Sequence, residues 1–442
     1  TDVGIFHRRV HRENIAVRQK LRVLCASAVH PLLLFGFSYS EITQPFADGA
    51  SPMKYVNEFR DPQKAGGLFR QIERLAADLP PLTRTPSRPI KIMEICGGHT
   101  HSIFRYGLED MLPPTIELVH GPGCPVCIMP RGRLDDAIAL SHEPNVIFTT
   151  FGDAMRVPGS RENLLQARAN GADIRLVYSP LDGLAIARNH HDKAIAFFAF
   201  CFETTTPSTA LTVLQAENEG IDNFSLFCNH VLVVPALEAL LANPALELDG
   251  FVGPGHVSTI IGTRPYDIIA THYHKPVVVS GFEPLDILQS VWMVLKQLAE
   301  GRCEVENQYS RLVTAMGNRV ALEAIDRVFE VRDVFEWRGL GDIPASGLKM
   351  RPSYARFDAE AKFSLPGRQV GDHKACACGE ILQGVKKPWD CKVFGTACTP
   401  EHPLGACMVS SEGACAAYYK YGAKDRAKIG IRNGTKTGAA PG

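Results

Sequence analysis

The cysteines of this 442-residue chain restrict its fold most, because their number and spacing indicate bound metal or redox chemistry. There are 13 Cys, an odd number that rules out complete pairing within the chain. Six of them lie between Cys376 and Cys415, in a segment without long apolar runs. Such a segment has little apolar surface to bury and needs a bound group to fold. Dense Cys clusters, in a long chain without a convincing export signal, are typical of proteins of reducing compartments.

The C-terminal Cys set favours an iron–sulfur cluster over zinc. Successive members are separated by one, twelve, six, eight and seven residues. Four thiolates suit a structural zinc ion or an iron–sulfur cluster, but zinc ribbons usually carry two tight C-x2-C pairs and this set has none. A [4Fe–4S] cluster would leave two thiols spare or redox-active. The set comprises Cys376, Cys378, Cys391, Cys398, Cys407 and Cys415.

The middle of the chain predicts an α/β protein with parallel sheets. Short apolar runs that mostly end in Gly, Pro, Cys or His alternate with helical patterns such as residues 134–140. This alternation is typical of parallel strands covered by helices. Similar strand and loop motifs occur twice, which predicts two similar Rossmann-like α/β domains with facing loops. The expected strands are 90–95, 116–119, 146–148, 174–178, 194–200, 224–227, 251–252 and 276–279.

Composition divides the chain into five expected regions. Residues 1–52 look foreign to the rest, with a basic start and a short apolar run before the first Met, Met53. A signal peptide is one interpretation, but the basic region is long, so we favour a translated upstream segment and a functional start at Met53. The expected regions are a 1–52 extension, α/β domains at 53–170 and 171–300, an iron–sulfur domain at 301–421 and a disordered tail at 422–442.

Charge and hydropathy exclude several classes of function. The chain has 47 Lys and Arg against 47 Asp and Glu, which gives no formal net charge. Proteins that bind nucleic acid or anionic membranes normally need a basic face, so we expect neither partner. No run reaches the roughly 18 apolar residues of a membrane span. Because the dense Cys clusters indicate a reducing compartment, we expect a cytoplasmic protein.

A second Cys motif lies in the sequence GPGCPVC. Its Cys124 and Cys127 are expected in a tight, exposed turn, because Gly and Pro surround them. The turn follows a predicted strand and precedes a predicted helix, a placement that can lower a thiol pKa and allow a reversible disulfide. We interpret the two thiols first as a redox pair and second as metal ligands.

A third motif, CGGHTH, begins with Cys96 at the end of the strand expected at 90–95. Two Gly let a ligand approach the backbone, and a thiolate near the imidazole of His99 suits iron or copper. In the second half, His256 of GPGHVST is either a polar lining of a shared cleft or a structural His. Neither this loop nor FETTTP matches a phosphate-binding fingerprint, so ATP use lacks support.

Together, CGGHTH, GPGCPVC, FETTTP, GPGHVSTIIG and CTPEHPLGACMVSSEGACAAYY resemble the HypD family of [NiFe] hydrogenase maturation proteins, from about Met53 to Gly422. The resemblance implies two α/β domains and a third that carries a [4Fe–4S] cluster. It also implies a scaffold that, with the small chaperone HypC, binds iron and assembles the Fe(CN)2(CO) unit destined for the hydrogenase large subunit. Cyanide would come from HypE, which receives its carbamoyl group from HypF.

The resemblance also implies roles for particular residues. Cys96 would be the iron ligand or the thiol closest to it, and His99 would support it. Cys124 and Cys127 would be the second essential thiol pair and further candidate metal ligands. Two more residues are expected near the working cleft: His256 and Glu412. The expected cluster ligands are Cys378, Cys391, Cys398 and Cys415, with Cys376 and Cys407 as reserves.

Such a protein would be an assembly scaffold with redox activity rather than a conventional turnover enzyme. One alternative is a stand-alone, cluster-dependent thiol–disulfide oxidoreductase that resembles ferredoxin–thioredoxin reductase and has no need of the CGGHTH loop. The other is a zinc-stabilised binding protein without a redox role. Metal analysis separates the second alternative, because it would contain zinc without iron or sulfide.

Overall fold

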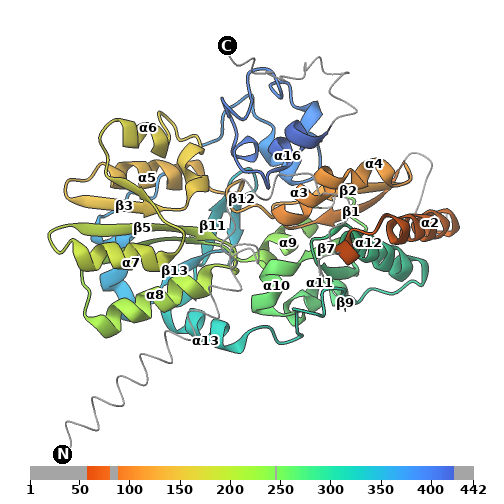
Figure 1. The fold of residues 1–442 in the computed structure, drawn as a ribbon, viewed down its shortest axis with the longest axis horizontal. Helices are drawn as coiled ribbons and strands as arrows, with labels where there is room; N and C mark the ends of the chain where they lie inside the picture. Colours follow the sequence, from red (N-terminus) through yellow and green to blue (C-terminus); the bar gives the residue numbers. More distant parts are fainter. Residues whose placement is uncertain (1–56, 80–87, 244–245, 423–442) are drawn as a thin grey trace, which may run out of the picture.

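The computed structural model describes residues 57–79, 88–243 and 246–422. Within them, two parallel sheets lie side by side with helices over their faces, and the Cys-rich segment lies against both (Figure 1). The predicted α/β fold with parallel sheets and a Cys-rich C-terminal region is confirmed. The extension at 1–52, the start at Met53 and the tail from 423 onward lie outside the described residues.

The first sheet has the strand order β2-β1-β7-β8-β9, and every neighbouring pair is parallel. In β1, Ile92 pairs with Leu118 of β2 on one side and with Gly250 of β7 on the other. The strands of this sheet are β1 (Ile90–Glu94), β2 (Ile116–His120), β7 (Gly250–Pro254), β8 (Val277–Ser280) and β9 (Val305–Asn307).

The second sheet is also parallel, with the order β4-β3-β5-β6. Both of its faces are covered, so its longest strands are nearly continuous apolar runs, as in the buried sequence AIAFFAF of β5. Its strands are β3 (Val146–Thr150), β4 (Ile174–Leu176), β5 (Ala194–Cys201) and β6 (Phe224–His230).

The chain starts the first sheet, builds the second and then returns to the first. Strands β1 and β2 precede β3 to β6, while β7 to β9 complete the first sheet. The expected ranges 53–170 and 171–300 therefore do not correspond to separate sheets, and β9 belongs to the range expected for the cluster domain. The reason is that β1 pairs with a strand about 160 residues later, and no local sequence signal records a partner so distant.

The helices cover the sheets and connect them. Helices α2 and α12 pack together over the first sheet in one apolar cluster with β1 and β8. Helices α7, α8 and α13 cover one face of the second sheet (Figure 1). The long helices are α2 (Pro62–Asp78), α3 (Gly97–Tyr106), α5 (Arg131–Ser141), α7 (Pro180–Asn189), α8 (Thr206–Glu219), α9 (Val233–Leu241), α12 (Pro284–Ala299), α13 (Arg319–Val328) and α16 (Ala414–Tyr421). The short ones are α4 (Leu108–Met111), α6 (Leu164–Ala169), α10 (Gly255–Ile261), α11 (Asp267–Thr271), α14 (Ala359–Lys362) and α15 (Cys378–Leu382).

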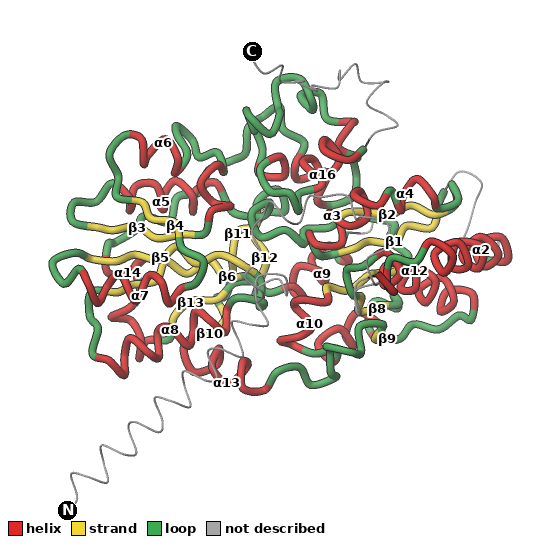
Figure 2. Tube along the Cα trace, viewed as in Figure 1, coloured by secondary structure: helices red, strands yellow, loops and turns green. Residues whose placement is uncertain are grey.

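Two small antiparallel pairs follow the sheets and lead to the Cys-rich segment. They are formed by β10 (Phe329–Val331) with β13 (Leu348–Met350), and by β11 (Val334–Trp337) with β12 (Gly341–Pro344). The segment beyond is mostly loop around α15 and α16 (Figure 2). One apolar cluster joins Val119, Phe198 and Cys407, so both sheets and the Cys-rich segment share a core.

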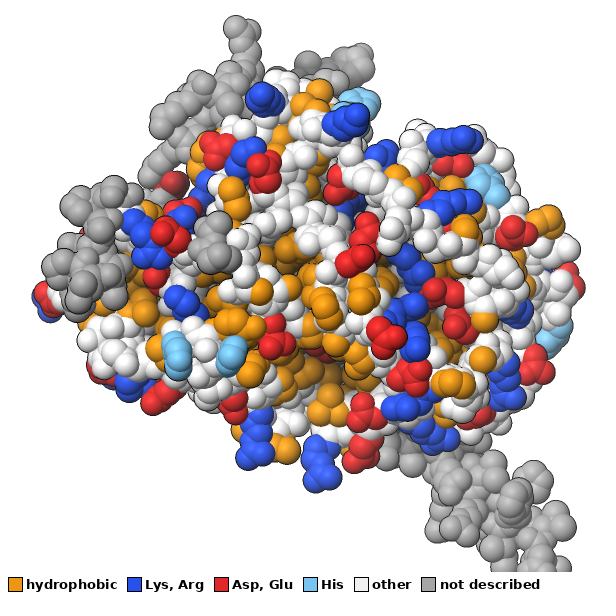
Figure 3. Space-filling view, turned by 180° about the vertical axis from the view of Figure 1, so that it is seen from behind, with side chains coloured by type: hydrophobic (Ala, Val, Ile, Leu, Met, Phe, Trp, Pro, Cys, Tyr) orange, Lys and Arg blue, Asp and Glu red, His pale blue; other side chains and the backbone are white. Residues whose placement is uncertain are grey.

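The surface carries charges of both signs. Figure 3 shows acidic and basic side chains interspersed over one face, in keeping with the balanced count of 47 each. Among the described helices, none is both long enough and apolar enough to span a lipid bilayer.

Candidate functional site

Cys96 lies in the turn that joins β1 to α3. It is the N-cap of α3 and is buried, with 8% of its surface exposed. Burial, followed by the carboxylate of Glu412, raises the pKa of the Cys96 thiol well above its usual range, although the amides of Gly98 and His99 favour the thiolate. Without a bound cation, Cys96 is therefore a protonated thiol at neutral pH.

A buried polar network supports this turn from below. The Glu94 carboxylate accepts the backbone N–H of Cys96 at 2.9 Å, lies 2.8 Å from Nδ1 of His120 and accepts the Thr100 hydroxyl. Burial lowers the pKa of His120, but Glu109 and Glu94 raise this pKa by more. The net effect is a raised pKa, so the imidazole keeps its proton to a higher pH than an ordinary His. Glu94 and His120 are not among the site residues predicted from the sequence. Their signal was a titratable side chain at the carboxyl end of a parallel strand.

His99 presents a free ring nitrogen inside the protein. Its Nε2 lies 2.9 Å from the carbonyl oxygen of Gly281 and 3.2 Å from that of Ser280, so Nε2 carries the proton. Its Nδ1 is buried and has no hydrogen-bond partner among the described residues. Burial lowers the pKa of His99, which keeps the ring neutral. A neutral imidazole with an unused lone pair is a potential metal ligand.

His256 lies farther out than His99. Phe282 separates them, with its ring stacked 4.7 Å from His99 and 3.8 Å from His256, centroid to centroid. His99 is fully buried, whereas His256 is exposed at the start of α10. The structure therefore places His256 at the rim of the site, one aromatic ring away from His99.

The C-x2-C motif forms a tight turn, with the N–H of Cys127 donating to Sγ of Cys124 at 3.3 Å. The prediction that this turn is exposed is wrong, because Cys124 is 3% exposed and Cys127 is completely buried. The Cys-rich segment covers the turn, and a Cβ on Gly413 would lie 3.0 Å from Sγ of Cys127. Burial therefore raises the pKa of both thiols, whereas the sequence suggested that it is lowered.

Two glycines let the CGGHTH turn contact its neighbours. A Cβ on Gly123 would overlap the backbone of Cys96, and the N–H of Gly97 donates to the carbonyl of Gly123 at 3.2 Å. A Cβ on Gly97 would lie 2.8 Å from Oε2 of Glu412 and closer still to its Cβ. These approaches bring Cys96, the C-x2-C turn and Glu412 together.

We predict that Gly123→Ala destabilises the protein by ~1–3 kcal/mol, because the new methyl group overlaps backbone that cannot rotate away. Urea denaturation compared with wild type measures the loss. Gly152→Ala is the matched control, since no atom lies within 4 Å of the position of its Cβ. Equal stability of the two variants would contradict the close approach.

Glu412 comes from the Cys-rich segment, just before α16. Burial, followed by the charges of Asp153 and Glu94, raises its pKa to about 7. Its charge acts on the thiols of Cys96 and Cys124. The carboxyl group can therefore take up or release a proton near neutral pH beside both of these cysteines.

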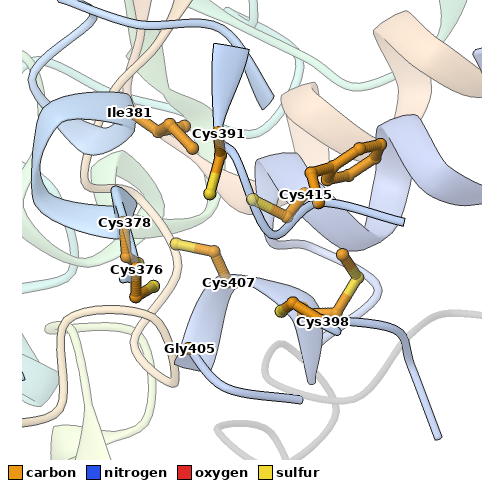
Figure 4. Close-up of a pocket in the computed structure, with 10 residues that line it drawn as sticks. Cys376, Cys378, Ile381, Cys391, Cys398, Gly405, Cys407 and Cys415 are labelled. Atoms are coloured by element: carbon orange, nitrogen blue, oxygen red, sulfur yellow. The ribbon is translucent and has the colours of Figure 1, made fainter. Parts of the chain in front are cut away.

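The six C-terminal cysteines line one pocket, which we call the six-thiol pocket (Figure 4). Its lining is completed by Ile381, Phe394, Gly405 and Met408. The side chains of Cys391, Cys407 and Cys415 point into it from separate segments of the chain (Figure 4). No three His, Cys, Asp or Glu side chains in the described ranges converge on a single metal ion. Sulfur donors spread around an apolar cavity fit a polynuclear cluster, whose irons each take a separate thiolate.

A row of sulfur contacts joins the C-x2-C turn to this pocket. The thiol of Cys407 interacts with Cys127 on one side and with Cys378 on the other. Cys378 in turn interacts with Cys376, whose sulfur a Cβ on Gly405 would overlap. Cys407, expected from the sequence as a reserve ligand, lies between the pocket and the second thiol pair.

The FETTTP loop follows β5 and contributes Glu203 to the junction between the sheets. The Glu203 carboxylate accepts the N–H of Val233 at the start of α9 at 3.0 Å, and its other oxygen is buried without a partner among the described residues. Burial raises the pKa of Glu203 to about 7. This loop thus supports the fold between the sheets.

Because the folded pKa of Glu203 is raised, its contribution to stability is largest below its unfolded pKa of about 4.3 and falls as pH rises to about 7. The variant Glu203→Gln does not titrate. We predict that the free energy of unfolding of Glu203→Gln, minus that of wild type, increases by about 2 kcal/mol between pH 5 and pH 8. Urea denaturation at both pH values measures the difference. Glu109 adds no such trend between pH 5 and pH 8, because its pKa is lowered to about 2 and its carboxyl group titrates below this range. A pH-independent difference for Glu203→Gln would contradict this assignment.

Comparison with known proteins bears on the whole site. The sequence model described as "HypD: Hydrogenase formation hypA family" matches residues 68–422. The chain belongs to the HypD family. The Hydrogenase maturation factor HypD of Rhodobacter capsulatus is 58% identical over 374 residues, which cover 84% of this chain and 98% of that protein. HypD2 of Bradyrhizobium diazoefficiens is 54% identical over 84% of this chain and 97% of its own. HypD of Escherichia coli K12 is 49% identical over 84% of this chain and 98% of that protein.

The HypD family match includes every site residue predicted from the sequence, from Cys96 to Cys415. In the structure, these residues fall into three groups: the turn after β1, the C-x2-C turn after β2 and the Cys-rich segment. His256 is the predicted site residue that lies outside them, on α10.

Proposed function

We propose that this chain is a hydrogenase maturation factor, a scaffold on which an iron ion receives two cyanide ligands and one CO ligand with the help of a HypC-type chaperone. The observation that carries the proposal is that Cys96 lies against the C-x2-C turn, which a row of sulfur contacts joins to the six-thiol pocket. Membership of the HypD family supports it, since the relatives are named hydrogenase maturation factors.

Cys96 and His99 are the proposed holders of the iron, which is the cargo of the scaffold. Binding of iron to the Cys96 sulfur displaces its proton, and Glu412, whose pKa is about 7, can accept that proton at neutral pH. The unused Nδ1 of His99 is a further donor or a hydrogen-bond acceptor on the same side of α3. Soft thiolates can hold the low-spin iron that cyanide and CO favour. Cyanide would be received from a HypE-type donor.

The six-thiol pocket is the proposed holder of a [4Fe–4S] cluster. When bound, the cluster supplies or accepts single electrons. Both ligand sets that we consider contain Cys391, Cys398 and Cys415. The sequence favours Cys378 as the fourth ligand. Cys376 is the alternative, because Cys378 also interacts with Cys407 in the row that leads away from the pocket.

The row of thiols has its own proposed task, which is thiol–disulfide exchange. The pairs Cys378–Cys407 and Cys124–Cys127 are adjacent through the interaction of Cys407 with Cys127. Oxidation of one pair to a disulfide, with reduction of the other, moves two electrons and two protons along the row. Free, buried thiols of this kind need a reducing compartment, so we propose a cytoplasmic location.

The same row favours one alternative, a stand-alone thiol–disulfide oxidoreductase. Such an enzyme would use the pocket and the C-x2-C pair without the iron site at Cys96. It would reduce a disulfide substrate in the absence of a HypC-type chaperone.

Infrared spectroscopy of the anaerobically purified complex with a HypC-type chaperone tests the proposal. Cyanide and CO stretching bands from bound iron are the expected result. An iron-loaded complex without these bands would contradict the scaffold function, and disulfide turnover without the chaperone would then favour the alternative. Zinc in place of iron and acid-labile sulfide would contradict the cluster.

A further inference from the structure

A buried arginine lies between the C-x2-C turn and the six-thiol pocket. Arg338 occupies the turn between β11 and β12 and is 3% exposed. Its backbone N–H donates to the carbonyl of Ile128, next to Cys127, at 2.8 Å. On the other side, Gly339 packs so closely on Gly379 that a Cβ on either residue would overlap the other's backbone. This turn therefore contacts both thiol segments.

The positive charge of Arg338 is only partly neutralised. Its Nε donates to Oδ1 of Asp372 at 2.5 Å, and the side chain of Asp372 is 28% exposed. Its Nη1 is buried and has no hydrogen-bond partner within the described part of the chain. The guanidinium is close enough for its charge to act on the thiols of Cys376 and Cys378. Burial of a charge that has a single carboxylate partner costs folding free energy. A further anionic group near Arg338 would offset this cost.

We propose that Arg338 is a positioning residue for the six-thiol pocket, where its buried positive charge favours one-electron reduction of a [4Fe–4S] cluster. The inference rests on the cluster proposed above and concerns its potential. One of Cys376 and Cys378 is a ligand in either proposed ligand set, so the charge lies beside a ligand in both cases. Reduction adds one negative charge to the cluster, and a nearby cation stabilises the reduced state more than the oxidised state. Asp372 acts in the opposite direction.

The test is a dithionite titration of the full-length protein with its cluster, followed by the electron paramagnetic resonance signal of the reduced cluster. Arg338→Met should lower the equilibrium constant for one-electron reduction by about tenfold, which equals about 59 mV. Arg338→Lys, which keeps the positive charge, should shift the reduction potential much less. Asp372→Asn should raise the potential, because the guanidinium loses its counter-charge. Arg188→Met, from the surface pair of Arg188 with Glu219, is the control for net charge and should cause no shift.

Opposite shifts in the Arg338 and Asp372 variants separate an electrostatic role from a purely structural one. Unchanged potentials, or shifts of the same sign, in variants with wild-type iron and sulfide content would overturn the inference. If Arg338→Met fails to load the cluster, the sign of the Asp372→Asn shift decides the question. If the wild-type protein contains no iron and sulfide, the proposed cluster is wrong. That outcome is distinct from a bound cluster whose potential is the same with and without the Arg338 side chain.

Discussion

A Cys96→Ala variant, purified anaerobically with a HypC-type chaperone, should show no cyanide or CO bands in the infrared while its iron–sulfur cluster content equals that of wild type. The reason is spatial. Cys96 lies in the turn after β1, whereas the six-thiol pocket is formed by the segment from Cys376 to Cys415. Removal of the Cys96 sulfur therefore takes away the proposed iron ligand and leaves the cluster ligands in place.

Cys303→Ala is the control for this experiment. Cys303 is a partly exposed thiol that donates to the carbonyl of His274 and is far along the chain from the three thiol groups. It should keep both the infrared bands and the cluster. Full-intensity bands in the Cys96 variant would show that another group holds the iron.

The second large effect is expected at the cluster. Cys415→Ala should lose nearly all iron and acid-labile sulfide, because both ligand sets include Cys415. Its thiol interacts with four others that line the pocket: Cys378, Cys376, Cys398 and Cys391. The Cys-rich segment should also become sensitive to proteases. It contains short helices and much loop, so the proposed cluster would supply a large part of its folding free energy (Figure 2).

Two single variants identify the fourth ligand. If Cys376 is the ligand, Cys376→Ala loses the cluster and Cys378→Ala keeps it, while the latter blocks exchange with Cys407. If Cys378 is the ligand, the two results are reversed. The iron and acid-labile sulfide contents of the two variants show which of the two cysteines is the ligand. Cluster content at the wild-type level in Cys415→Ala would contradict both sets.

The sequence was a good guide to individual strands and a poor guide to their partners. The eight expected apolar runs all correspond to strands β1 to β8, because burial on both faces of a sheet demands such runs. Strand β9, with the sequence VEN, has no apolar run and was missed. The position of β7 beside β1 was not foreseen, since parallel partners need not be neighbours in sequence.

The site could be predicted where chemistry depends on residue type and spacing, as for the thiols. It could not be predicted where it depends on contacts across the fold. Arg338 is one Arg among many in the sequence, and only its burial between two thiol segments distinguishes it. The exposure of the C-x2-C turn was misjudged for the same reason, because the segment that covers it lies more than 250 residues later.

The path of the chain through the two sheets has a consequence for biosynthesis. Strand β2 ends at His120, but its neighbour β1 cannot pair with β7, which begins at Gly250, until β7 has left the ribosome. At roughly 5–20 residues per second, that delay is about 7–26 s. The Cys-rich segment follows later still, and until then Cys124 and Cys127 lack the cover that this segment supplies. During this interval the nascent chain depends on cellular reductants to keep these thiols from oxidising prematurely.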